Sequence, residues 1–68
     1  MKRLRLGEQI HHLRIRRGLS QRALAEEAEL SRIYIAKLEA SERISPSLPA
    51  LERIAKALGA KVRIKLTS

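Results

Sequence analysis

Basic side chains are the residues of this chain whose number and type suggest a chemical role. Lysine and arginine together number 15 against 7 acidic residues, which gives a formal net charge of +8 on 68 residues. Such an excess on a small domain favours a polyanionic partner, although a surface charged for solubility is the alternative. Tyr34 is the only residue among Phe, Tyr and Trp. Because RNA-binding and single-strand-binding surfaces usually stack bases on aromatic rings, we expect duplex DNA rather than RNA.

The sequence contains no arrangement typical of an enzyme or a metal site. No paired carboxylates, nucleophile with a base or phosphate-binding loop is visible, so we expect neither catalysis nor a cofactor. The chain has no cysteine, which excludes disulfides and thiolate ligands. His11 and His12 are adjacent and would point about 100° apart on a helix, so they could not both ligate one metal. We interpret them as surface residues.

No segment suggests insertion into a membrane. The longest apolar run is too short to cross a bilayer, and the N-terminus lacks the apolar stretch of a signal peptide. We therefore expect a cytoplasmic protein. A basic amphipathic membrane peptide would also fit the charge, but the helix starts and stops described next indicate a folded bundle.

Segment 19–39 contains the same helix-start signal twice, as a Leu-Ser pair at 19–20 and again at 30–31. Each Ser can accept a hydrogen bond from free N–H groups of a helix's first turn. Each Leu can pack on the apolar residue at the fourth helical position, Leu24 or Ile35. The two starts lie 11 residues apart, which suits a short helix, a tight turn and a second helix. This spacing predicts a helix-turn-helix with helices over 20–28 and 31–40.

Apolar spacing and stop residues predict one further helix on each side of this segment. The first covers 6–17 and ends at Gly18, which can adopt the left-handed conformation of a helix stop. The fourth is capped by Ser47, because Pro49 then falls in the first turn, where N–H groups lack partners anyway. It ends at Gly59. The side chains expected to face the core are Leu6, Ile10, Leu13, Leu24, Ala25, Ala28, Ile35, Leu38, Leu51, Ile54, Ala55 and Leu58.

The two ends of the chain differ from the helical part. Residues 1–5 include three cations and no acid, which suggests an arm along a phosphate backbone or a frayed terminus without a role. In 60–68 the apolar residues Val62, Ile64 and Leu66 alternate with polar ones, as in a strand. A lone strand leaves backbone groups unpaired, so we expect an antiparallel ribbon in a homodimer, with a disordered or weakly docked tail as the alternative.

Several short motifs occur together between residues 6 and 59. They are Arg14, GLSQ at 18–21, LA at 24–25, SRIYIAKLE at 31–39 and PSLPALERIAKALG at 46–59. Their combination resembles the XRE family of lambda-repressor and Cro-type helix-turn-helix proteins. The resemblance implies a mainly α fold, a compact bundle of four or five helices whose third helix enters the major groove. The short C-terminal β-strand expected here lies outside that shared core.

The resemblance also implies roles for individual residues. Arg32, Ile33 and Lys37 would face base edges, where cations can donate to guanine and an apolar side chain can meet a thymine methyl. Arg14 and Glu39 would form an internal ion pair between the first and third helices. Phosphate contacts would come from Gln21, Ser31, Tyr34, Ser41 and Arg43. Solvated surface roles remain the alternative for Arg32, Lys37 and Gln21, and a packing role for Tyr34.

The sequence departs from the family pattern at two positions. The turn position usually held by Gly is Glu29, and a left-handed backbone there would cost about 1–2 kcal/mol. The family often has a Gly two residues after Glu39, where this chain has Ser41. A different loop path is therefore possible after the third helix.

The predicted function is sequence-specific binding of double-stranded DNA by a transcriptional regulator, in the first instance a repressor. A homodimer would place its two recognition helices in successive major grooves of an inverted repeat, about 34 Å apart. The domain organisation would be a basic arm at 1–5, a DNA-binding domain at 6–59 and a dimerisation strand at 60–68. The alternative is an antitoxin that binds a toxin protein and represses its own operon. The sequence has a basic strand tail rather than a long disordered neutralising arm, which favours the first hypothesis.

Overall fold

The computed structural model describes residues 5–40 and 43–60, which form four α-helices. They are α1 (Leu6–Arg16), α2 (Gln21–Ala28), α3 (Arg32–Ala40) and α4 (Leu48–Ala57). The predicted mainly helical fold is thereby confirmed. Most of the predicted arm, Ser41 and the predicted strand with Val62, Ile64 and Leu66 lie outside the described residues. Within the described ranges, no helix has the length and apolar character needed to cross a membrane.

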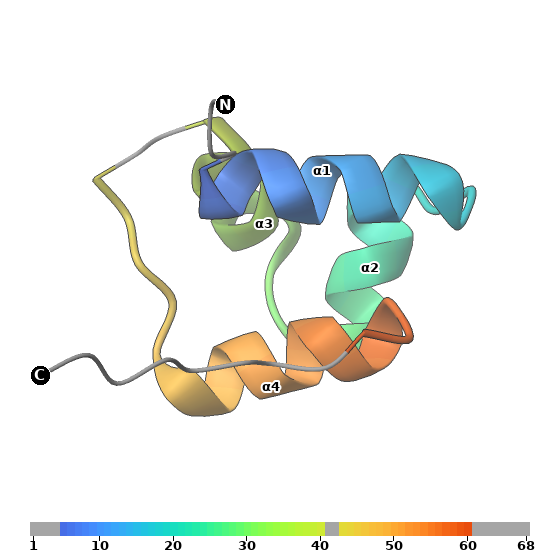
Figure 1. The fold of residues 1–68 in the computed structure, drawn as a ribbon. Coiled ribbons are helices and arrows are strands. Elements are labelled where there is room, and N and C mark those ends of the chain that lie inside the picture. The colour runs from blue at the N-terminus through green and yellow to red at the C-terminus, as the bar shows by residue number, and fades with distance from the viewer. Residues whose placement is uncertain (1–4, 41–42, 61–68) are drawn as a thin grey trace, which may run out of the picture.

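The α2–α3 pair lies between the other two helices. Helix α2 packs against both α3 and α4, and α1 packs against α3. Figure 1 shows α1 and α4 on opposite sides of this central pair. The flanking helices therefore support the helix-turn-helix from two directions.

Three serines begin helices in the same way. The side-chain oxygens of Ser20, Ser31 and Ser47 each accept a hydrogen bond from the backbone N–H three residues further on, at 3.0, 3.0 and 3.2 Å. Pro49 lies in the first turn of α4, as the choice of Ser47 as cap requires. The predicted starts of α2, α3 and α4 are confirmed, and each cap contributes about 1 kcal/mol.

Three helices end in the same left-handed geometry. Gly18, Glu29 and Gly59 have φ angles of 70°, 57° and 68°. At each, the N–H of the following residue donates to the carbonyl five residues before it, at 3.0, 2.8 and 2.8 Å. This is the Schellman motif, which normally uses glycine. Glu29 therefore forms the turn of the helix-turn-helix with a backbone conformation that a side chain disfavours.

The core lies where all four helices meet. Its buried residues are Ile10, Leu24, Ala25, Ala28, Ile35, Leu38, Ile54 and Leu58. Leu13 is only partly buried but packs against this core, whereas two other core predictions were wrong. Leu6 is 38% exposed, because it is the first residue of α1 and helical side chains point toward the N-terminus, past the end of the bundle. Leu51 is only half-buried, since α4 turns the neighbouring Ala50 inward instead.

Candidate nucleic-acid interface

The outward face of α3 combines two cations with an apolar side chain. Arg32, Ile33 and Lys37 are all exposed, whereas Ile35 and Leu38 on the opposite face are buried. Ile33 is 60% exposed, the highest value among the large hydrophobic residues exposed in the described part of the chain. The core does not use this face of α3, so its side chains are available to a partner.

The residues expected to contact phosphate lie in different settings. Ser31 is exposed, and its oxygen caps α3, so its hydroxyl proton remains able to reach an external acceptor. Tyr34 is half-buried and packs against the core, in agreement with the packing alternative. Arg43 is exposed beyond the end of α3, and Ser41 falls outside the described residues.

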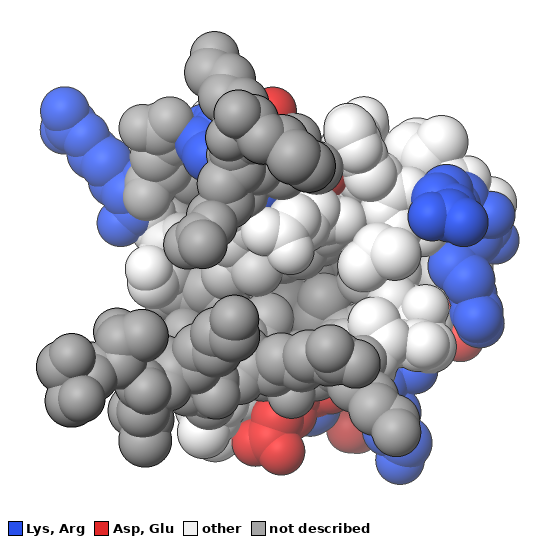
Figure 2. Space-filling model, in the orientation of Figure 1, with Lys and Arg blue, Asp and Glu red and all other residues white. Residues whose placement is uncertain are grey.

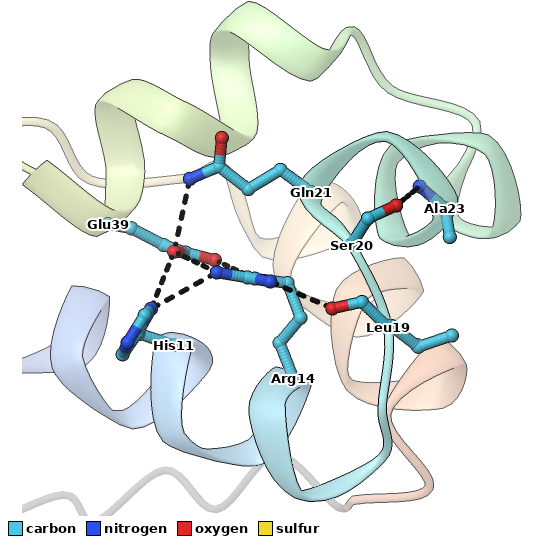
Figure 3. A network of polar contacts seen from close by, with 7 residues as sticks. All are labelled: His11, Arg14, Leu19, Ser20, Gln21, Ala23 and Glu39. Atoms are coloured by element: carbon cyan, nitrogen blue, oxygen red, sulfur yellow. Dashed lines mark hydrogen bonds and ion pairs between the residues drawn. The ribbon is translucent and has the colours of Figure 1, made fainter.

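Arg14 and Glu39 form a bidentate ion pair between α1 and α3 (Figure 3). Arg14 Nε donates to Glu39 Oε2 at 2.7 Å, and Arg14 Nη2 donates to Glu39 Oε1 at 3.0 Å. Arg14 Nη1 donates to the backbone oxygen of Leu19 at 2.8 Å. The guanidinium therefore joins three places: α1, the turn before α2, and the last turn of α3.

Two further side chains reach the same carboxylate oxygen. Gln21 Nε2 donates to Glu39 Oε1 at 3.2 Å, and His11 Nδ1 lies 3.0 Å from that oxygen. Residues of α1, α2 and α3 thus meet at one buried acid. This contact fixes the first residue of α2 relative to the end of α3.

The ion pair is largely shielded from water. The side chains of Arg14 and Glu39 are 9% and 6% exposed. Burial acts to raise the pKa of Glu39, but the hydrogen bonds from Arg14, His11 and Gln21 outweigh it and hold the pKa below its usual range. The bond to Glu39 raises the pKa of Arg14. Both groups are therefore charged at neutral pH, and each satisfies the other.

The side chain of Gln21 is not freely exposed, as that of a residue that only contacts phosphate would be. It is half-buried and directs its amide nitrogen to Glu39, while its oxygen points away from that acid in Figure 3. The amide has a second N–H. The contact of Gln21 with a DNA phosphate stays a prediction. The structure shows in addition that Gln21 makes a hydrogen bond within the protein, to Glu39.

Two residues of this region were not identified from the sequence. A Cβ placed on Gly7 would overlap the carbonyl oxygen of Leu38 and stand 3.1 Å from Glu39 Cα, so α1 and α3 approach closely there. A lone Gly near the start of a helix gives no warning of such a contact. His11 was interpreted only as a surface residue; its position three residues before Arg14, on the same helix face, was the signal that could have placed it.

Two acidic residues at the end of α2 lie beside α4. Glu27 and Glu29 line a shallow groove together with Arg53 and Lys56 of α4. In Figure 2, Lys and Arg side chains occupy several parts of the visible face, whereas most visible acids lie at its lower edge near α4. The cations of α4 thus lie close to acids, whereas no acidic residue of the described ranges forms an ion pair with Arg32 or Lys37.

Comparison with known proteins agrees with this geometry. Residues 5–63 match the family described as Helix-turn-helix domain. The chain belongs to that family. The match also agrees with the XRE-type resemblance. Over 57 residues this helix-turn-helix domain is 47% identical to the immunity repressor protein of Bacillus phage phi105. The alignment covers 84% of this chain and 39% of that protein, so the chain spans well under half the length of its relative.

Proposed function

We propose that this helix-turn-helix domain binds double-stranded DNA as a transcriptional regulator, and that it represses. The exposed Arg32–Ile33–Lys37 face of α3 is the observation that supports this most directly. A net charge of +8 suits a polyanionic partner. The similarity to a protein named as an immunity repressor favours repression over activation.

Sequence choice would come from α3. Arg32 and Lys37 can donate to guanine O6 and N7, and Ile33 can contact a thymine methyl. Helix α3 must enter the groove at a fixed angle, because a side chain reads a base edge only when its backbone is held in register. The buried Arg14–Glu39 pair and the contact of Gln21 with Glu39 would hold α3 at a fixed angle to α1 and α2.

Affinity would come mainly from phosphate contacts. The proposed phosphate contacts are Gln21, Ser31, Tyr34, Ser41 and Arg43, and Tyr34 also packs against the core. Such contacts release counterions, so binding should weaken steeply as salt concentration rises. They position the protein on the duplex without choosing its sequence.

A homodimer on an inverted repeat completes the proposal, with the apolar residues of 60–68 pairing between copies. Such a dimer would place two α3 helices in successive major grooves. An antitoxin role is the alternative. Co-purification of the protein encoded by a neighbouring gene would favour it.

The test is selection of bound duplexes from a random pool, followed by a mutation scan of the selected half-site. An inverted repeat with half-sites about one helical turn apart is the expected result. Selection of a single asymmetric site would contradict the dimer. Failure to enrich any duplex would contradict sequence-specific binding itself.

A further inference from the structure

His11 lies at the junction of three helices. Its Nδ1 is 3.0 Å from Glu39 Oε1 and 3.1 Å from Arg14 Nη2 (Figure 3). The ring is not enclosed, since 48% of its side chain is exposed. It lines an open pocket together with Glu8, His12, Gln21 and Glu39. One side of the imidazole thus faces a buried ion pair and the other faces solvent.

A single ring nitrogen cannot satisfy both of these neighbours. When Nδ1 has no proton, it can accept from the Arg14 N–H, but it then turns a lone pair toward the Glu39 carboxylate. When Nδ1 carries a proton, it can donate to Glu39, but it then turns an N–H toward the Arg14 N–H. Nδ1 therefore has one unfavourable contact whether or not it carries a proton, and it can carry one in the neutral Nδ1–H tautomer as well as in the charged imidazolium.

Whether the charged imidazolium form of His11 is favoured depends on the charged groups around the ring. Glu39 faces it from α3, but this carboxylate already accepts from Arg14 and Gln21. On α1 itself, Arg14 adds a positive charge, and Glu8 is engaged by Arg5 at 3.1 Å. The His12 ring centroid is 6.0 Å away. A protonated His11 would therefore leave the junction with more positive than negative charge at close range.

An anion at the open side of the pocket would remove that imbalance. Gln21 is the first residue of α2, so the unpaired backbone N–H groups of a helix N-terminus lie close to the same pocket. The proposed function already places a DNA phosphate beside Gln21. Such a phosphate would stabilise a charge on His11 by direct Coulombic attraction.

We propose that His11 takes up a proton when a phosphate of duplex DNA binds beside Gln21, so that DNA affinity increases as pH falls. This inference rests on the proposed function and adds to it a dependence of DNA affinity on pH. By linkage, one proton taken up can change the affinity by at most about tenfold per pH unit. Histidine is the side-chain type that commonly changes charge between about pH 5 and pH 8, so the dependence is sought in that range.

The test uses a duplex of about 30 base pairs of arbitrary sequence, because a phosphate contact does not depend on sequence. Dissociation constants are measured at one ionic strength from about pH 8 to about pH 5.5 for the wild type, His11→Asn and His12→Asn. Asparagine offers an uncharged polar group near the position of Nδ1. We expect wild-type affinity to increase about five- to tenfold across this range, and that of His11→Asn to change less than about twofold. His12 also lines this pocket, but among the described residues only His11 contacts both Arg14 and Glu39, so His12→Asn should retain most of the wild-type dependence.

A second measurement protects the test against a variant that fails to fold. The His11 ring of the wild-type protein is titrated by NMR with and without the same duplex, and its midpoint should move to higher pH when DNA is bound. An unchanged midpoint would overturn the proposal, as would equal pH dependence in His11→Asn and the wild type. Salt-sensitive duplex binding with either of those results would leave the proposed function intact. Absence of duplex binding at every pH would overturn both.

Discussion

Gly7 of α1 lies directly against the backbone of Leu38 in α3. A side-chain carbon on Gly7 would overlap the Leu38 carbonyl oxygen and come within 3.1 Å of Glu39 Cα. This contact brings the two helix backbones together one residue before Glu39. The close approach of α1 and α3 is therefore part of what allows Arg14 to reach that acid.

The substitution Gly7→Ala tests this approach. In an ordinary helix, replacing Gly by Ala stabilises by about 1 kcal/mol. Here the added methyl group must push α1 away from α3, so we expect a destabilisation of about 1–3 kcal/mol. Urea unfolding measures the change as a lower midpoint at an unchanged slope. Ile15→Ala, at an exposed position of the same helix, should change the midpoint little; equal stability of Gly7→Ala and the wild type would contradict the close approach.

At Glu29 we expect a substitution to stabilise the protein, in contrast to Gly7→Ala. Its φ of 57° is unfavourable for any residue with a side chain, and the same Schellman geometry is formed by glycine at positions 18 and 59. We expect relief of this strain to stabilise Glu29→Gly by about 1 kcal/mol. The greater flexibility of glycine in the unfolded chain reduces this gain in stability. Thermal and urea unfolding would both report the gain.

Gly18→Ala is the matched control for that substitution. A Cβ on Gly18 would meet nothing within 4 Å, so the cost of this change is backbone strain alone. We expect a loss of about 1 kcal/mol. If both variants shifted stability in the same direction, strain at the left-handed positions could not be the cause.

Local features of the sequence predicted most of the fold. Ser20, Ser31 and Ser47 were identified as caps because a cap acts within three residues, whatever surrounds it. The inward faces of α2 and α3 follow from helical periodicity in the same way. Leu6 and Leu51 were misassigned because exposure at the end or edge of an apolar stripe depends on what the neighbouring helices cover.

Contacts between helices were harder to foresee. The Arg14–Glu39 pair came from a family resemblance, not from the spacing of two residues 25 positions apart. The approach at Gly7 and the placement of His11 depend on the crossing angle of α1 and α3. Side-chain periodicity fixes which face a residue occupies, but not how deeply two helices interlock.

The Arg14–Glu39 pair should behave as a coupled unit in a double-mutant cycle. Arg14→Met or Glu39→Leu alone leaves one buried charge without its partner, at an expected cost of about 3–5 kcal/mol. The double variant removes both charges, so it should be much more stable than the sum of the single changes implies. Urea unfolding of all four proteins gives the coupling energy. Additive single effects would show that the pair contributes little as a pair.

The depressed pKa of Glu39 predicts a pH dependence of stability. A carboxyl with a lower pKa in the folded state binds fewer protons there than in the unfolded chain, so low pH favours unfolding. The stabilisation is present above the unfolded value of about 4.3 and is lost as pH falls through the folded value. The urea midpoint should therefore fall less between about pH 7 and about pH 3 in Glu39→Gln than in the wild type. The exposed Glu27→Gln should show the wild-type decrease; a decrease of the same size in Glu39→Gln would contradict this role of Glu39.

Arg32 and Arg53 provide the test of which surface contacts DNA. Both are exposed arginines on helices, so alanine removes the same charge from each. Arg32→Ala should weaken binding to the selected operator by about 1–3 kcal/mol and relax the choice of base at one position. On random duplexes it should have a much smaller effect, because base contacts specify while phosphate contacts position. Arg53 lines the groove that contains Glu27 and Glu29, and its replacement should leave base preference unchanged. Equal weakening of operator and random binding by Arg32→Ala would assign Arg32 to the phosphate backbone instead of a base.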